Sequence, residues 1–421
     1  MERPSAATPA AEVRQPPSRF ALRAAIGLAA AGLLLWFVVP VTAAGILRNR
    51  DGVPAWVRQL APYDARSMAL SPQRLVTDYR RPGVLDRMRA EAVAALLRDP
   101  TVVQAVNVLG VSYAIANDAG RAERAFLYSQ SLSRRDLFAQ LWLIERNVQR
   151  NDIRGALAHY DTVLRTSPPG GQNLFPLLVA ASRTPAIATE LNRLLRARPN
   201  WGQDFLTAFL LAQTDPAALY TVTRGVVGPG DPAQREHLTL LLRALTGAEA
   251  FDLAWRAYLD AWPGRARAGP PVWNGDFTEA PGLAPFDWGF AEDPAKAAER
   301  RARAGGDFAL YLPTGVTSDT EAARQLVRLA PGSYVLTGAA GGVAEDEATR
   351  PLITISCARR PHRMLASLDL PVSPETGRRF AMRFAIPADC AYQWVSVRVR
   401  GSFERQMSAV AWVDAIRIGR P

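Results

Sequence analysis

The chain has 421 residues, a formal net charge of +11 at pH 7 and a hydrophobic content of 48%. This length exceeds one ordinary hydrophobic core, so two or three folded units are expected. Its positive charge is carried by arginine except at Lys296 and is scattered along the chain. The scatter excludes a compact basic block, and no zinc-finger or RNA-binding signature occurs, so no nucleic acid partner is expected. Acidic surfaces, anionic polymers or phospholipid headgroups would still be attracted over a Debye length of about 10 Å.

The N-terminal region is predicted to carry a membrane anchor. Residues 1–18, rich in Ala, Pro and Ser, are expected to form a short disordered tail. Residues 19–47 are predicted to form the anchor, because Ala24–Leu47 carries no charge and is long enough, as a helix, to cross a hydrocarbon core of about 30 Å. Small residues at 41–44 would suit signal cleavage, but the uncharged stretch exceeds the usual apolar region of about 7–15 residues. An uncleaved anchor is therefore favoured, although arginines on both sides leave its orientation open.

A helical repeat follows. The spacing of five residues matches the tetratricopeptide pattern: Leu109, Gly110, Tyr113, Ala122 and Phe126. A shift of 34 residues, the period of that repeat, brings in a degenerate second copy with Leu143, Ala156, Tyr160 and Pro168. The chain thus resembles a tetratricopeptide-repeat (TPR) membrane protein. In that family the small residues let antiparallel helices approach closely and the aromatic residues fill the seam, so they specify packing rather than a ligand.

Two repeats need flanking helices to cover their ends, since a solenoid usually needs about three units. A TPR-like helical domain is predicted over residues 72–260, with about ten helices. Helical spacing of apolar residues continues in five further runs: Leu85–Leu97, Ala186–Ala197, Trp201–Gln213, Arg235–Leu245 and Ala248–Asp260. Pro199, Pro216 and Pro232 are expected to break the helices between them.

The C-terminal part is predicted to be all β. Residues 261–271 have the composition of a linker, and the apolar period changes from helical to alternating after them. Short alternating runs then follow one another without helices: Phe308–Leu312, Gln325–Leu329, Tyr334–Thr337, Leu352–Cys357, Arg379–Ile386, Trp394–Val399 and Ala411–Ile418. They predict a β-sandwich, a jelly roll, over residues 272–421. The expected fold class is multidomain, α then β: a transmembrane helix, a TPR-like α-solenoid and a C-terminal β-sandwich.

Four motifs sharpen this prediction: Trp273-Asn-Gly-Asp-Phe277, Phe286-Asp-Trp288, Gln325-x-Val-x-Leu-x-Pro-Gly-x-Tyr334 and Trp412-Val-Asp414-x-Ile-x-Ile418. They resemble the galactose-binding-like jelly rolls that include several carbohydrate-binding modules. The resemblance implies the fold and makes Trp288, Tyr392 and Trp394 candidates for glycan contact, because aromatic faces bind the apolar side of a sugar ring. Packing in the core or at an edge is the alternative for each ring.

Some members of this family hold a structural calcium between the first and last strands. Asp276 and Asp414 would be the matching carboxylates here. Thr278 and Ala415 lie where acidic residues are common in the family. Too few carboxylate ligands therefore remain for a calcium ion, which binds six or more oxygen atoms. No cofactor is therefore expected beyond this calcium site.

The two cysteines, Cys357 and Cys390, both lie in the predicted β domain, each beside a strand-like run. A pair in one β domain favours a disulfide and an oxidising compartment, and two buried free thiols are the alternative.

No catalytic constellation is found. The three histidines lie in separate segments, so no nucleophile–base–orienter triad is indicated, and no Gly-rich phosphate loop or His-Glu-x-x-His motif occurs. A non-enzymatic role is therefore expected, although a carboxylate pair of a glycosidase would leave no local spacing signature.

Together these features predict a single-pass protein of the bacterial inner membrane with its C-terminal domains in the periplasm. It would dock an envelope protein partner through its helical repeats, bind a polysaccharide through its sandwich, and act as a scaffold in exopolysaccharide biosynthesis or export. The alternative is a purely structural protein–protein scaffold of an inner-membrane complex without sugar specificity.

Overall fold

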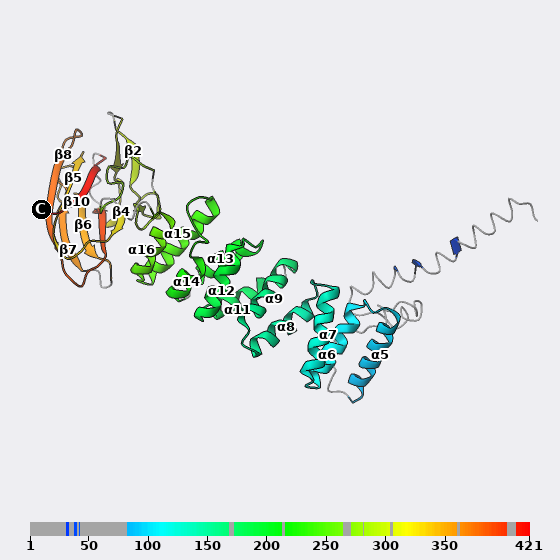
Figure 1. The fold of residues 1–421 in the computed structure, drawn as a ribbon. Helices are drawn as coiled ribbons and strands as arrows, with labels where there is room; N and C mark the ends of the chain where they lie inside the picture. Colours follow the sequence, from blue (N-terminus) through cyan, green and yellow to red (C-terminus); the bar gives the residue numbers. More distant parts are fainter. Residues whose placement is uncertain are drawn as a thin grey trace, which may run out of the picture. The chain divides into compact units, whose positions relative to one another are not determined.

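The computed structural model describes residues 31–32, 38–39, 42, 82–167, 172–212, 215–263, 271–280, 282–303, 306–359, 363–401 and 410–421 (Figure 1). The predicted tail, residues 1–18, lies outside them, as does the predicted anchor, residues 19–47, apart from five helical positions. Within the described part of the chain, no helix combines the length and apolar character needed to span a membrane.

The chain divides into two compact units, residues 1–166 and 167–421. The division falls inside the helical region. Of the linker predicted at residues 261–271, residues 264–270 lie outside the described part. Hydrogen bonds and ring contacts join the last helices to the sandwich within the second unit.

The first unit contains five described helices: α5 (Val84–Arg98), α6 (Val103–Ile115), α7 (Ala119–Leu132), α8 (Leu137–Gln149) and α9 (Ile153–Thr166). Helices α8 and α9 begin 34 residues after α6 and α7, respectively. The turn inside each pair repeats as well. Asn117 and Asn151 both have positive φ, at 58° and 57°, a conformation that asparagine tolerates better than most residues.

Close approach of α6 and α7 depends on Gly110. A Cβ atom at this position would lie 2.7 Å from Cζ of Phe126, so any side chain there would push the ring away. Phe126 is buried and stacks on Trp142 of α8 with ring centroids 4.9 Å apart. The same ring therefore joins the α6–α7 pair to α8. Tyr113 is half-buried, with the guanidinium of Arg121 5.0 Å from its ring centroid.

The remaining residues of the repeat pattern differ in burial. Ala122, Leu143 and Ala156 are buried, whereas Leu109 and Tyr160 are half-buried. Pro168 lies outside the described residues.

The second unit begins with helices: η1 (Gln172–Leu174), α11 (Phe175–Ala181), α12 (Pro185–Arg196), α13 (Gly202–Leu211), α14 (Pro216–Thr223), α15 (Pro232–Gly247) and α16 (Phe251–Ala261). Pro216 and Pro232 open their helices rather than breaking them. The first N–H of a helix has no partner within the helix, so a proline in the first turn loses no hydrogen bond.

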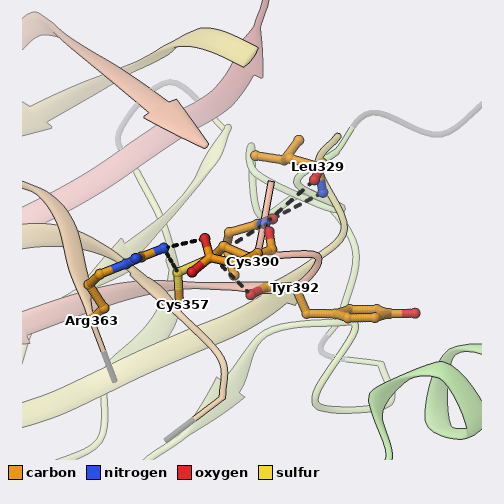
Figure 2. Close-up of a disulfide and its surroundings, with 7 residues drawn as sticks. Leu329, Cys357, Arg363, Cys390 and Tyr392 are labelled. Atoms are coloured by element: carbon orange, nitrogen blue, oxygen red, sulfur yellow. Dashed lines mark hydrogen bonds and ion pairs between the residues drawn. A yellow bond between two sulfur atoms is a disulfide. The ribbon is translucent and has the colours of Figure 1, made fainter. Parts of the chain in front are cut away.

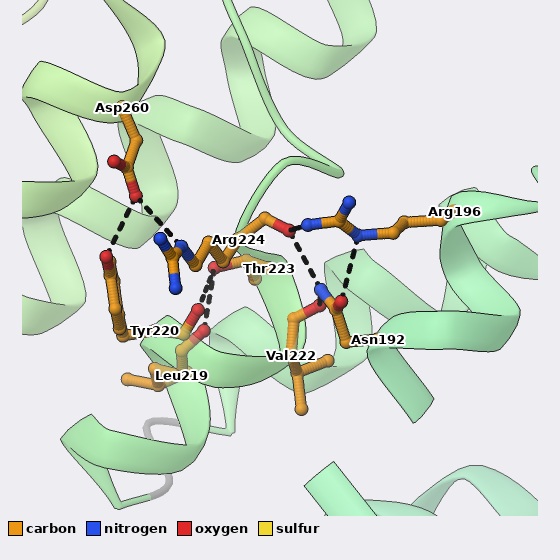
Figure 3. Close-up of polar contacts among 8 residues, drawn as sticks. All are labelled: Asn192, Arg196, Leu219, Tyr220, Val222, Thr223, Arg224 and Asp260. Atoms are coloured by element: carbon orange, nitrogen blue, oxygen red, sulfur yellow. Dashed lines mark hydrogen bonds and ion pairs between the residues drawn. The ribbon is translucent and has the colours of Figure 1, made fainter. Parts of the chain in front are cut away.

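Side chains of a neighbouring helix donate hydrogen bonds to the carbonyl groups at the C-terminal end of α14 (Figure 3). Asn192 Nδ2 on α12 donates to the carbonyl oxygens of Val222 and Arg224, each at 2.9 Å, and Arg196 Nη2 donates to the latter at 3.1 Å. On the other side, the Asp260 carboxylate of α16 accepts from the Tyr220 hydroxyl at 2.8 Å. Carbonyl groups that the helix end leaves unpaired thus hold α12 to α14, and the Tyr220–Asp260 hydrogen bond joins α16 to α14.

The β-sandwich has two antiparallel five-stranded sheets, ordered β1-β4-β9-β6-β7 and β2-β3-β10-β5-β8. Its strands are β1 (Gly289–Phe290), β2 (Glu299–Ala302), β3 (Phe308–Tyr311), β4 (Thr320–Val327), β5 (Gly332–Gly341), β6 (Leu352–Cys357), β7 (Met364–Asp369), β8 (Arg378–Ile386), β9 (Gln393–Val399) and β10 (Trp412–Gly419). Seven of them match the predicted runs. The other three, β1, β2 and β7, lie at sheet edges and are short or polar, whereas the fourth edge strand, β8, alternates and matches a predicted run.

Candidate functional site

The central strand β9 presents different residues to the two faces of its sheet. Val395 and Val397 belong to the core between the sheets, so Trp394 and Ser396 lie on the opposite, outer face. Strand β4 pairs with β9 in antiparallel register, which places Arg324 directly opposite Ser396. The outer face of this sheet thus brings an aromatic ring, a hydroxyl and a guanidinium together.

Polar contacts fix these side chains in place. The Ser396 hydroxyl donates to the Glu321 carboxylate at 2.7 Å, and Arg324 Nη1 lies 3.2 Å from the same carboxylate. The Arg324 guanidinium also lies 4.3 Å from the centroid of the Trp394 ring. Trp394 is only 6% exposed, because this arginine covers part of its ring.

A pocket of about 580 Å³ lies against this face, within the range of about 300–1,000 Å³ that is usual for small-ligand sites. We call it the junction pocket, since helices α15 and α16 form one side and the sandwich the other. It is lined by Thr239, Arg243, Thr246, Gly247, Glu249, Phe251, Ala284, Pro285, Gly289, Phe290, Ala291, Glu292, Glu321, Arg324, Ala358 and Trp394.

Helix α15 contributes a polar stripe to the junction pocket. Thr239, Arg243 and Thr246 follow one another at intervals of four and three residues, which places them on one face of the helix. The buried leucines of α15, Leu238, Leu241, Leu242 and Leu245, belong to a different face. Packing of the leucines against the other helices therefore turns the polar stripe toward the pocket.

Tyr392 anchors helix α16 to the sandwich. Its hydroxyl donates to Asp252 Oδ1 at 2.9 Å, and its ring lies 5.6 Å from that of Phe251. Burial, and then the hydrogen bond to Asp252, hold the pKa of Tyr392 well above its usual range. This residue was a candidate for glycan contact. With 5% of its surface exposed, it instead packs against protein.

A second anchor lies beside it. The Tyr258 hydroxyl of α16 donates to the buried carboxylate of Asp287 at 3.3 Å. The centroid of the Phe286 ring lies 4.9 Å from that of Tyr258 and 5.0 Å from that of Trp255. The Asp287 carboxylate also accepts from the backbone N–H of Leu283 at 2.6 Å. Burial of this charge is thus offset by hydrogen bonds from both sides of the contact.

Trp288, another candidate for glycan contact, belongs to the core of the sandwich. It is 2% exposed, and its ring packs on Phe277 with centroids 5.4 Å apart. No face of the ring is open to a ligand, so the prediction does not fit its position. The Phe-x-Trp motif there is a packing motif, and only Trp394 of the three candidate aromatics lines the junction pocket.

The disulfide between Cys357 and Cys390 lies where β6 ends and β9 begins (Figure 2). The Cα atoms of the two residues are 5.6 Å apart. Next to it, the backbone N–H of Ala358 donates to the carbonyl oxygen of Tyr392 at 2.9 Å. The Tyr392 side chain points away from the disulfide. The bond therefore holds the segment that carries both Tyr392 and Trp394.

Asp276 and Asp414, the candidate calcium ligands, are engaged with protein groups. Asp276 Oδ1 accepts from the Thr278 hydroxyl at 3.0 Å, and the Asp414 carboxylate lies 3.4 Å from Arg303 Nη1. Burial raises the pKa of Asp414, although the Ala415 amide and Arg303 act against this shift. Among the residues described, no group of three or more His, Cys, Asp or Glu side chains could hold a metal ion.

Sequence reasoning identified Trp394 but missed the other groups around it. Glu321 and Arg324 lie in β4, and only the C-terminal half of this strand shows the apolar pattern that predicted it. The polar residues of α15 resemble the solvent-exposed face of an ordinary helix. The alternation of β4 could have placed Arg324 on the outer face. Nothing local could have placed α15 beside it.

No protein-family model matches the chain, and comparison with curated proteins found no match. Similar solved structures include a CBM4 structure, with a TM-score of 0.28 and 17% identity over 36% of this chain and 99% of that chain. TmCBM61 in complex with β-1,4-galactotriose gives 0.26 and 15%, over 37% and 100%. The CBM22-1 xylan-binding domain of Paenibacillus barcinonensis Xyn10C gives 0.25 and 12%, over 34% and 90%. The function proposed for this chain therefore rests on its own residues.

Proposed function

We propose that this chain is a non-catalytic saccharide-binding protein of the bacterial envelope, held at the inner membrane by residues 19–47, whose helical repeats dock an envelope protein partner. The observation that carries the binding role is the junction pocket. There Arg324 and Glu321 offer the fixed polar groups that saccharide sites use, and Trp394 lines the wall beside them.

The helical part supports the docking role through its surface. Helix α5 exposes Leu97 at 83% and Val93 at 43%, one turn apart, and α8 exposes Val148 at 56%. Apolar side chains on a solenoid surface suit contact with another protein. The 34-residue interval between the α6–α7 and α8–α9 pairs supports assigning them as tetratricopeptide repeats.

Placement in the periplasm is supported by the disulfide and by the uncharged stretch Ala24–Leu47. A reporter enzyme fused after Pro421 tests it. Activity of a periplasm-dependent reporter is expected, and activity of a cytosol-dependent reporter at the same position would overturn the topology.

Saccharide binding is tested with the purified full-length chain on a glycan array. Arg324→Ala is expected to weaken retention, because it removes a donor at the pocket and the group that orients Glu321. Arg301→Ala is the matched control. Arg301 likewise pairs with a glutamate, Glu299, and lies over an aromatic ring, that of Tyr311, but on the other sheet.

The competing function is a purely structural scaffold. It is favoured by Tyr392, because the ring of this residue packs against α16 and not against a ligand. Absence of retention on any glycan, together with co-purification of a membrane protein partner, would decide for the scaffold.

A further inference from the structure

The junction pocket has two walls of different origin. Its sandwich wall carries Trp394 and the Glu321–Arg324 pair, whereas its helical wall carries Thr239, Arg243 and Thr246 of α15. From this arrangement we infer that the helical wall completes the binding site, and that the saccharide held between the two walls is electrically neutral. The inference rests on the proposed function and names the ligand class and the residues that select it.

The two threonines are suited to accept hydrogen bonds from sugar hydroxyls. Thr239 Oγ1 donates to the Arg235 carbonyl oxygen at 2.9 Å, and Thr246 Oγ1 donates to the carbonyl oxygen of Leu242. Each hydroxyl proton is thus used within the helix, which leaves the oxygen lone pairs to accept. Both side chains are half-buried and line the pocket, so their positions are fixed by the helix before a ligand arrives.

The lining of the pocket contains two arginines and three glutamates. Arg324 lies 3.2 Å from Glu321, and Arg243 Nη2 lies 3.6 Å from the Glu292 carboxylate. Glu249 adds a third carboxylate to the lining. Positive charge is therefore not in surplus here, although the whole chain carries +11. An acidic saccharide would need an arginine surplus, since recognition of a carboxylate relies on guanidinium groups that are not already neutralised.

Both walls are held at a fixed separation by α16. The hydrogen bonds from Tyr392 to Asp252 and from Tyr258 to Asp287 fasten this helix to the sandwich. Helix α15 packs against α16. A ligand that contacts both walls therefore meets a preformed site rather than two surfaces that must first be brought together.

The test uses the full-length chain and isothermal titration with three neutral trisaccharides, cellotriose, xylotriose and β-1,4-galactotriose, and with tri-galacturonic acid. The double variant Thr239→Val/Thr246→Val keeps side-chain shape and removes both acceptors. Its binding of a neutral trisaccharide is expected to be about 4- to 100-fold weaker, the combined effect of losing two hydrogen bonds at about 2- to 10-fold each. The matched control is Thr189→Val, because Thr189 is an exposed threonine of α12 whose hydroxyl also donates within its helix, to Pro185 O at 2.9 Å.

Each outcome separates the inference from the function beneath it. Weaker binding in the double variant and unchanged binding in Thr189→Val support the helical wall. Binding of a neutral trisaccharide that Arg324→Ala weakens but the double variant leaves unchanged overturns the helical wall and keeps the proposed function. Tighter binding of tri-galacturonic acid than of every neutral probe overturns the neutral class. Binding of none of the four probes by the wild-type chain overturns both the inference and the saccharide-binding role.

Discussion

Removal of the disulfide is expected to destabilise the second unit by an amount that follows from the chain it encloses. Cys357 and Cys390 are 33 positions apart in sequence. Closing a loop of that size restricts the unfolded chain by about 3.7 kcal/mol at 25 °C in the chain-entropy relation. For a unit of this size, each kcal/mol corresponds to about 2–4 °C in melting temperature, so a decrease of about 7–15 °C is expected.

The measurement is thermal unfolding of the Cys357→Ser/Cys390→Ser variant, followed by near-ultraviolet circular dichroism because Tyr392 and Trp394 lie on the segment that the bond holds. The chain has two cysteines, so dithiothreitol should lower the melting temperature of the wild type and leave that of the variant unchanged. A variant that melts within about 2 °C of the oxidised wild type would refute the loop-entropy reasoning. The same variant should also lose affinity at the junction pocket, because the bond holds the segment with Tyr392 and Trp394.

Three further perturbations test individual contacts. Gly110→Val should destabilise the first unit by about 1–3 kcal/mol, measured by urea unfolding, because its side chain would overlap the Phe126 ring. Tyr392→Phe should cost about 1.5–3 kcal/mol in the second unit, the range for a hydrogen bond to a charged group, as the Asp252 carboxylate loses its donor. Asp414→Asn should become more stabilising relative to the wild type as the pH rises. Burial raises the folded-state pKa of Asp414 above its unfolded value of 3.8, so ionisation costs stability across that interval.

Each of these three substitutions has a control or a result that would contradict its argument. Gly230→Ala should have little effect, because no atom lies within 4 Å of the added methyl group, and equal destabilisation by both glycine substitutions would contradict the packing argument. Unchanged stability of Tyr392→Phe in scanning calorimetry would contradict a stabilising role for the hydrogen bond from Tyr392 to Asp252. For Asp414→Asn, a difference in melting temperature from the wild type that is constant between acidic and neutral pH would show that the carboxyl group is not perturbed by burial.

Local patterns in the sequence predict much of the secondary structure. Spacing of small and aromatic residues such as Gly110 and Phe126 is a property of one helical pair, so the contact between them could be read from the repeat pattern. Alternation in runs such as Arg379–Ile386 likewise predicted strands, because a sheet with one buried face imposes a period of two. Of the four strands at sheet edges, β1, β2 and β7 lack such a pattern and were not predicted, as the charged β2 illustrates.

The residues of the candidate site can be identified only from contacts between elements that are distant in the sequence. Trp288, Tyr392 and Trp394 look alike in sequence, yet one fills the core, one fastens α16 and one lines a pocket. Their roles depend on which surfaces meet across long separations in the chain, such as α15 and β4. The periodicity of a local sequence does not reveal which elements pack together. The free energy of a long-range contact depends on the packed arrangement of whole elements rather than on neighbours in sequence.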